Sequence, residues 1–198
     1  VTAQNYESPT DAGGNNVYDV TVQVSDGTLS STQAIAVTVT PVNDNTPAIT
    51  SSATASVAEN STAVMTVTAT DADLPAQTLS YSIVGGADAA KFSINSTTGA
   101  LSFVAAQNYE SPTDAGGNNV YDVTVQVSDG ALTSTQAIAV TVTPVNDNTP
   151  AITSSATASV AENTTAVLTV TATDADLPAQ TLTYSIVGGA DAAKFSIN

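Results

Sequence analysis

Carboxylates are the side chains through which this sequence could do chemistry. Its 198 residues include 18 Asp and Glu against two Lys, with no Arg, His or Cys, and the net charge is −16. Without imidazoles or thiols the chain lacks common general bases, nucleophiles and soft metal ligands, so any bound metal must be held by oxygen. The lack of positive charge also excludes a nucleic acid or an anionic membrane held by basic contacts.

Several acids stand in short motifs that suit an extended chain. Asp71 and Asp73 are two residues apart, so on a strand both side chains point to the same side. Such a pair could serve a glycosidase, but no apolar pocket is predicted that would raise one pKa, and we expect no enzyme. Carboxylates mixed with Asn and backbone carbonyls are the oxygen ligands that calcium prefers over magnesium or zinc.

These motifs belong to a tandem repeat. Residues 4–9 (QNYESP) return as residues 107–112, an offset of 103, and aligning 1–95 with 104–198 leaves six differences. This near-identity indicates recent duplication within a longer array. We therefore expect the chain to be a window of two repeats that lacks one copy of residues 96–103.

Alternating apolar residues predict the elements that position the acids. Apolar side chains at every second position of 121–127 indicate a half-buried strand. The same pattern over 65–69, 79–83, 92–94, 101–103 and 138–142, with a leading strand near 49–58, gives seven strands per repeat. Turn motifs separate them, and helical periodicity is confined to one turn at 88–91. We predict an all-β fold, a seven-stranded Greek-key β-sandwich of immunoglobulin-like architecture, in tandem and joined end to end.

The linkers divide the chain into five parts. We expect a complete repeat at 48–145, flanked by the C-terminal part of a repeat at 1–42 and the N-terminal part of another at 151–198. The segments 43–47 and 146–150, each with the sequence Asn-Asp-Asn-Thr-Pro, are the predicted calcium-binding linkers.

Sandwich topology should gather the acids at both ends of the complete repeat, because strand ends and linkers meet there. The first predicted junction contains Asn5, Glu7, Asn43, Asp44, Asn45, Asp71, Asp73 and Asp129. The second contains Glu59, Asn108, Glu110, Asn146, Asp147, Asn148, Asp174 and Asp176. Like charges about 4 Å apart repel by about 4 kcal/mol at an effective dielectric of about 20, so each junction should attract a cation. The remaining acids Asp11, Asp19, Asp88, Asp114, Asp122 and Asp191 are expected to be solvated.

In this order the motifs resemble the cadherin repeat from end to end. The motifs are Ala58-Glu59-Asn60, Thr70-Asp71-Ala72-Asp73, Asn108-Tyr109-Glu110, Val127-Ser128-Asp129 and Asn146-Asp147-Asn148-Thr149-Pro150. The near-identical copies and the long stretch 111–120 look most like bacterial tandem-repeat surface adhesins.

The resemblance implies up to three Ca²⁺ ions per junction. Its implied ligands at the second junction are Glu59, Glu110, Asn146, Asp147, Asn148, Asp174 and Asp176. At the first they are Glu7, Asn43, Asp44, Asn45, Asp71, Asp73 and Asp129. Pro41, Pro144, Asn5 and Asn108 replace aspartates of the family pattern and remove negative charge. We therefore expect weak affinity, about 10⁻⁴ to 10⁻³ M as in extracellular modules.

The leading functional prediction is an extracellular module, secreted or attached to the cell surface, whose repeats calcium stiffens into an adhesive rod. Its partners would be adjacent repeats of the same chain and, through homophilic contacts or self-assembly, other copies. Two alternatives stay open. The sandwich could bind polysaccharide or protein without calcium, or half-repeats of different chains could complete each other by strand complementation and form a filament. No apolar run approaches the roughly 20 residues that cross a bilayer, so no direct membrane insertion is expected.

Overall fold

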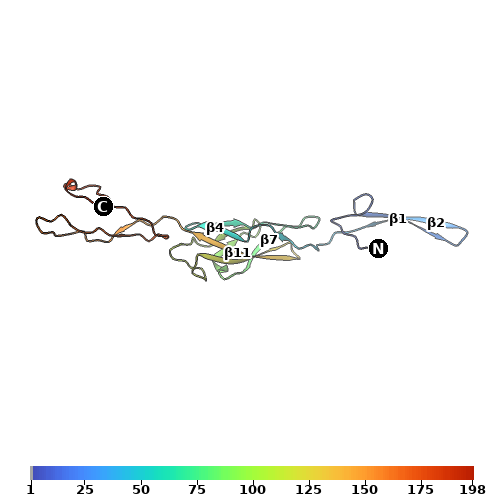
Figure 1. Ribbon diagram of the computed structural model, residues 1–198. Helices are drawn as coiled ribbons and strands as arrows, with labels where there is room; N and C mark the ends of the chain where they lie inside the picture. The colour runs from blue at the N-terminus through green and yellow to red at the C-terminus, as the bar shows by residue number, and fades with distance from the viewer. Residues whose placement is uncertain (1) are drawn as a thin grey trace.

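Antiparallel strands joined by turns form most of the chain. The structure is a computed structural model that describes residues 2–198. It is elongated, with a sandwich in the middle and a half-repeat at each end (Figure 1). Helical geometry is found in two short 3-10 turns, η1 (Ala89–Lys91) and η2 (Ala192–Lys194). The all-β fold and the predicted turn near 88–91 are therefore confirmed.

Two sheets face each other in the central repeat. The first has the order β4 (Thr54–Ala58), β11 (Thr133–Thr143), β10 (Val120–Ser128) and β7 (Ser80–Gly85), and β4 is parallel to β11. The second has the order β5 (Ala63–Thr66), β9 (Ala100–Phe103) and β8 (Phe92–Ile94). A short pair, β3 (Ala48–Ile49) with β6 (Ala69–Thr70), lies next to the linker before the repeat.

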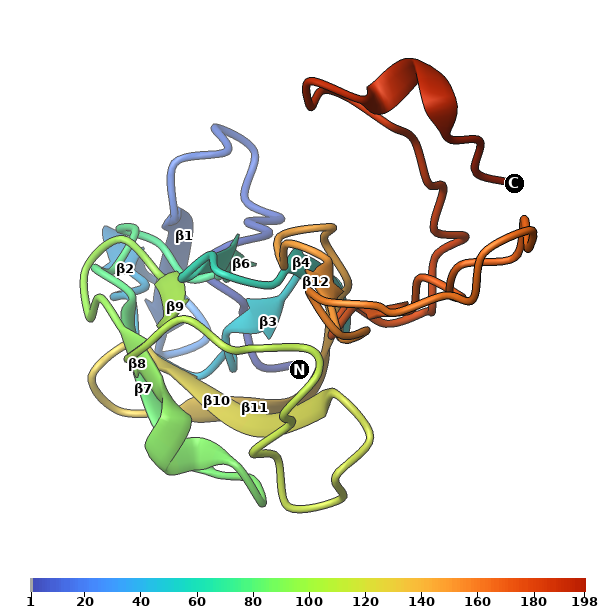
Figure 2. The same ribbon diagram turned by 90° about the vertical axis from the view of Figure 1, so that its left-hand side faces the viewer.

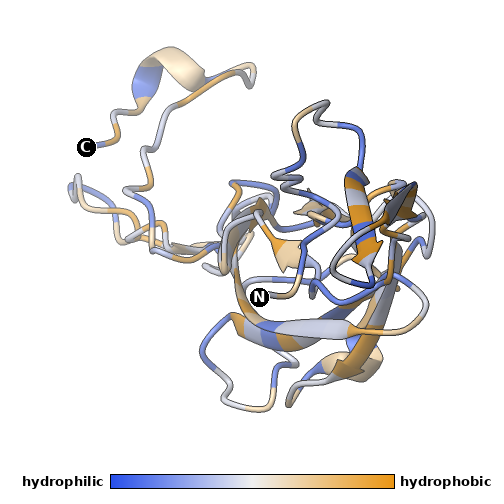
Figure 3. Ribbon diagram, turned by 90° about the vertical axis from the view of Figure 1, so that its right-hand side faces the viewer, coloured by the Kyte–Doolittle hydropathy of each residue, from blue (hydrophilic) through white to orange (hydrophobic). Residues whose placement is uncertain are grey.

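The core lies between the two sheets. On β10 the side chains of Tyr121, Val123, Val125 and Val127 are at most 1% exposed, as the alternation of the sequence predicted. Phe103 of β9 packs edge-on against Tyr121, with ring centroids 5.2 Å apart, so an aromatic contact joins the sheets. Figure 3 shows hydrophobic and hydrophilic residues alternating as bands along the strands.

Two predicted strands are each divided. The leading strand expected near 49–58 is split into β3, which pairs with β6, and β4, which pairs with β11 in the opposite sheet. The chain crosses between the sheets at 50–53, where the amides of Thr50 and Ser51 both donate to the carbonyl of Thr68. The strand expected at 65–69 is likewise divided into β5 and β6 around Val67, whose amide donates to Gly99.

The two half-repeats differ in how much of each forms strands. Residues 2–42 contain the hairpin of β1 (Val17–Ser25) and β2 (Ser30–Thr38), in the same register as β10 and β11. Residues 151–198 repeat the sequence of 48–95, which predicts the first four strands of a repeat. The structure has only the strands β12 (Ala151–Ile152) and β13 (Ala172–Thr173) there, and the rest runs as an open arc (Figure 2). The prediction fails because β4 and β7 are strands only through their bonds to β11 and β10, and this segment has no such partners.

Among residues 2–198, no helix combines the length and the apolar character needed to cross a bilayer.

Candidate metal centre

Three carboxylates from separate parts of the chain meet before the central repeat. Glu7 comes from the first half-repeat, Asp44 from the linker and Asp73 from the segment after β6, and each offers an oxygen within 4.8 Å of the others. The amide of Leu74 donates to Glu7 Oε1 at 3.4 Å. Linker and both repeats thus contribute to one acidic group.

A second acidic group shares Asp73 with the first. Asp71, Asp73 and Asp129 also bring carboxylate oxygens within 4.8 Å of one another. Asp129 lies in the β10–β11 turn, where its Oδ1 accepts the amides of Ala131 and Leu132, both at 2.7 Å. One oxygen each of Asp71 and Asp129 is buried without a hydrogen-bond partner. Buried anionic oxygens normally have a partner, so a cation between them fits this arrangement.

Asp73 is held in place as an anion. It is 1% exposed, and its Oδ1 accepts the Asn45 side-chain amide at 2.6 Å and the Asn45 backbone amide at 3.2 Å. Its own amide donates to Asp71 Oδ1 at 2.9 Å. The side-chain bond from Asn45 is the main reason that the pKa of Asp73 lies below its ordinary value. The linker therefore fixes the carboxylate in the form that a metal requires.

The opposite end of the central repeat carries the third group. Glu59, Glu110 and Asp147 offer oxygens within 4.8 Å of one another. Glu59 is only 2% exposed because its Oε1 accepts the amide of Val145 at 2.7 Å and its Oε2 that of Tyr109 at 2.8 Å. It joins the end of β4 to the residue just before the linker and to the segment before β10.

The hydrogen bonds around Asp73 recur around Asp176 at the second junction. Asp176 accepts the Asn148 side-chain amide at 2.7 Å, which is the main cause that lowers its pKa, and its own amide donates to Asp174 at 3.1 Å. The amide of Leu177 donates to Glu110 at 3.1 Å. Within residues 2–198 no third acid joins Asp174 and Asp176 in the way that Asp129 joins Asp71 and Asp73.

The predicted linker amides lie in different environments. Asn43 is half-buried and its Oδ1 has no hydrogen-bond partner, whereas Asn146, at the same position in the second linker, is exposed. Asn108, a candidate metal residue of the sequence analysis, is exposed, and its Oδ1 accepts the amide of Ser111 at 2.8 Å. Asn5 has a similar role, accepting the amide of Glu7 at 2.7 Å. These two Asn side chains stabilise turns.

Sequence reasoning missed one residue and misjudged two. Asn60 was not among the expected site residues, yet its side chain donates to Asp147; its position directly after Glu59 was the available clue. The expectation that Asp88 and Asp114 are solvated is wrong, since they are 5% and 7% exposed. Asp88 accepts the amides of Ala115 and Asp122, and Asp114 accepts two amides of its own loop, so both fix the stretch 111–120.

No protein cation compensates the acidic groups in the described part of the chain. The one ion pair within residues 2–198 joins Lys194 to Asp191 at 3.0 Å, and Lys91 donates to Thr113. Because the oxygens that meet in the three groups belong to carboxylates, the groups suit a hard cation with oxygen ligands, and calcium best.

Comparisons with known proteins agree with this geometry. Residues 53–143 match the family model of the Cadherin domain. The chain is 33% identical over 209 residues to human Protocadherin Fat 1, an alignment that covers 97% of the chain and 4% of that protein.

Solved structures of cadherin repeats also resemble this chain. The Protocadherin gammaB7 EC3-6 cis-dimer structure aligns with a TM-score of 0.58 and 28% identity over 85% of this chain and 45% of the other. Mouse Cadherin-23 EC22-24 aligns with a TM-score of 0.56 and 27% identity over 85% of this chain and 56% of the other. The chain thus spans about half of each of these structures.

Proposed function

We propose, from the premise that residues 53–143 form a Cadherin domain, that this chain is a stretch of an extracellular adhesion array stiffened by calcium at its junctions. In this proposal 48–145 is one complete repeat, 43–47 and 146–150 are calcium-binding linkers, and 1–42 and 151–198 are parts of neighbouring repeats. The observation that carries it is the meeting of acids from the linker and both adjoining repeats at the first junction. At the second junction, acids of the central repeat and the linker meet, and the next repeat is bonded to them through the amide of Leu177.

Calcium would supply positive charge that the chain itself lacks at these points. Glu7, Asp44, Asp71, Asp73 and Asp129 would hold it at the first junction, with Asn43 and Asn45 adjacent. Glu59, Glu110, Asp147, Asp174 and Asp176 would hold it at the second, with Asn146 and Asn148 adjacent. Without a cation these carboxylates repel one another and the junction loosens, while the apolar core keeps the sandwich folded.

The array would act at a surface outside the cell. Two features support this: the match to the Cadherin domain and the repeated near-identical copies. The copies and the long stretch 111–120 are also why we propose the bacterial tandem-repeat adhesin type, although Protocadherin Fat 1 is a human protein and the Cadherin-23 structure is from mouse. Homophilic contact between arrays is the proposed mode of adhesion.

A binding platform for polysaccharide has less support. Phe92, Phe103 and Tyr121 are at most 5% exposed, and Tyr109 packs against the core. In the central repeat the aromatic rings that commonly stack on sugars are therefore used inside the sandwich.

Small-angle X-ray scattering with far-UV circular dichroism tests the proposal. The chain is measured in 5 mM calcium and again in chelator. We expect the maximum dimension to contract on chelation while the strand spectrum persists. A dimension that does not change, or sandwiches that unfold on chelation, would refute calcium-dependent stiffening of folded repeats.

A further inference from the structure

The backbone of Tyr109 connects two carboxylates of the second junction. Its amide donates to Glu59 Oε2 at 2.8 Å, and its carbonyl belongs to the peptide bond that leads to Glu110. Glu59 and Glu110 both offer oxygens to the same acidic group. The orientation of the Tyr109 backbone therefore affects how these two carboxylates lie relative to each other.

Asn119 holds the same backbone from its carbonyl side. Its Nδ2 donates to the carbonyl of Tyr109 at 2.9 Å. Asn119 is 9% exposed and is itself fixed by two bonds: its amide donates to Asp114 Oδ1 at 3.0 Å, and its carbonyl accepts the amide of Val142 of β11 at 2.9 Å. The stretch 111–120 thus ends in a side chain that ties the Tyr109 backbone to the sandwich.

The backbone conformation of Asn119 limits which residues suit this position. Its φ is 62°, in the left-handed region that Asn and Gly adopt more readily than most residues. Asn supplies both this conformation and a side-chain donor. Glycine would keep the conformation and lose the donor, which makes it the natural test variant.

The same arrangement forms in the first half-repeat. Asn16 has a φ of 61°, and its Nδ2 donates to the carbonyl of Tyr6 at 2.9 Å, directly before Glu7. Its amide donates to Asp11 Oδ1 at 3.1 Å. Each junction therefore receives a glutamate whose preceding carbonyl is bonded to an Asn ten residues further along the chain.

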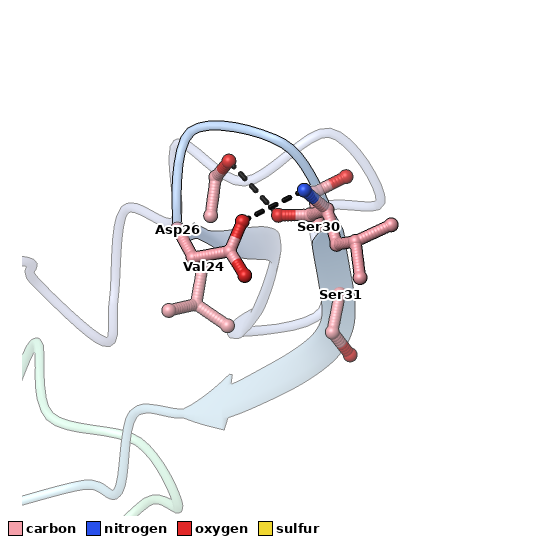
Figure 4. Close-up of a pocket in the computed structure, with 6 residues that line it drawn as sticks. Val24, Asp26, Ser30 and Ser31 are labelled. Atoms are coloured by element: carbon pink, nitrogen blue, oxygen red, sulfur yellow. Dashed lines mark hydrogen bonds between the residues drawn. The ribbon is translucent and has the colours of Figure 1, made fainter.

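Other contacts that recur between the copies are more local. Asp26 Oδ1 accepts the amides of Thr28 at 2.9 Å and Leu29 at 2.8 Å in the β1–β2 turn (Figure 4), as Asp129 does in the matching turn of the central repeat. These bonds stay inside one turn. The bond from Asn119 differs because it reaches the segment that carries a junction glutamate.

We propose that Asn119 is a positioning residue for the calcium group of the second junction, and Asn16 for that of the first. Neither side chain is among those that would hold the ion; each acts by fixing the backbone before Glu110 or Glu7. Partners that orient metal ligands in this way typically change metal affinity by about 10- to 100-fold when they are removed. The inference rests on the calcium function proposed above and gives the stretch 111–120 a role in it.

Calcium titration followed by nuclear magnetic resonance tests the proposal at each junction separately. The amides of Leu74 and Leu177 donate to Glu7 and Glu110, so their calcium-dependent shifts report the Kd of the first and second junction. Asn119→Gly should raise the Kd reported by Leu177 about 10-fold and leave that reported by Leu74 unchanged.

Two variants serve as matched comparisons. Asn118→Gly also removes a side chain from the stretch, but Asn118 is exposed and its Oδ1 accepts the amide of Val120, so either Kd should change by less than about 2-fold. Asn16→Gly should show the reverse pattern of Asn119→Gly, with the loss at the first junction. Equal effects of Asn118→Gly and Asn119→Gly, or a loss by Asn119→Gly at both junctions alike, would overturn the proposal.

A double-mutant cycle distinguishes positioning from a general effect on the fold. If Asn119 acts mainly through Glu110, then Asn119→Gly in a Glu110→Gln background should raise the remaining Kd by less than about 3-fold. A full further 10-fold loss in that background would mean that Asn119 supports the sandwich rather than the ligand, and would refute the assigned role.

Hydrogen exchange in chelator separates this inference from the calcium proposal. Asn119→Gly should lower the protection of the Tyr109 amide, which donates to Glu59, and Asn118→Gly should not. A wild-type chain without calcium-dependent shifts would refute the calcium proposal, while loss of Tyr109 protection in Asn119→Gly would still support the positioning of this backbone. Unchanged Tyr109 protection would refute the positioning role even where calcium binds.

Discussion

Replacing Glu59 by alanine should destabilise the central repeat, and by more in calcium than in chelator. Both carboxylate oxygens accept backbone amides at part-buried positions, from Val145 at 2.7 Å and Tyr109 at 2.8 Å. Alanine leaves these two amides without a partner, at about 2 kcal/mol each or about 4 kcal/mol together.

The same substitution relieves repulsion when no cation is bound. Glu110 and Asp147 have oxygens within 4.8 Å of Glu59, but Asp147 is exposed and Glu110 half-buried. Solvent screening reduces each repulsion to about 1 kcal/mol, so the relief is about 2 kcal/mol. The unfolding free energy should therefore fall by about 2 kcal/mol in chelator and by about 4 kcal/mol in calcium, within the 5 to 15 kcal/mol typical of a domain.

Urea unfolding followed by circular dichroism measures both values. The matched control is Glu162→Ala, the same residue one repeat later, which is exposed and should change the unfolding free energy little. Glu59→Gln keeps an acceptor for one amide and should fall between wild type and Glu59→Ala. An equal loss with and without calcium would refute a cation at this group, and no loss in either condition would refute the bracing role of Glu59.

Two further predictions concern the sandwich itself. Val125→Ala should lower the unfolding free energy by about 2 kcal/mol because the side chain is fully buried. The matched substitution Val22→Ala should lower it by less than about 0.5 kcal/mol in dilute monomer, because Val22 is exposed. Equal losses in urea unfolding would contradict the packing described. Burial raises the pKa of Asp114, but the amides of Asn118 and Asn119 outweigh it, so its pKa lies below the ordinary 3.8. A lowered pKa stabilises the folded form above pH 3.8, and this contribution is lost as the pH falls through the lowered value. Hydrogen exchange of the Asn118 and Asn119 amides should therefore lose protection only below that pH, and Asp114→Ala should abolish the protection throughout.

The sequence by itself determined the repeat, the strands of the sandwich core and the residue types of the acidic groups. Alternation over 121–127 is a local property that survives as β10, because period-two side chains always face opposite sides of a strand. The linker acids could be assigned to junctions because strand ends and linkers of a sandwich must meet at its two ends. Neither inference needs an atomic distance.

Tertiary structure decided which acids are buried. Nothing in the sequence distinguishes Asp88 and Asp114 from Asp19 or Asp122. They are buried because loop amides donate hydrogen bonds to their carboxylates. Convergence of this kind depends on how the 111–120 stretch folds back against η1, which no local pattern encodes. Likewise, the position of Asp73 depends on a hydrogen bond from the linker residue Asn45, 28 residues earlier in the chain.

Two segments of nearly the same sequence separate the effect of sequence from the effect of tertiary structure most clearly. Residues 48–95 and 151–198 differ at three positions, Ser61/Thr164, Met65/Leu168 and Ser80/Thr183. The first segment forms β3 to β8, while the second forms only β12, β13 and a 3-10 turn. A strand needs the amides, carbonyls and apolar side chains of its neighbours, and only the first segment has β9, β10 and β11 beside it. Sequence therefore set which residues could form strands, and the neighbouring strands decided which of them did.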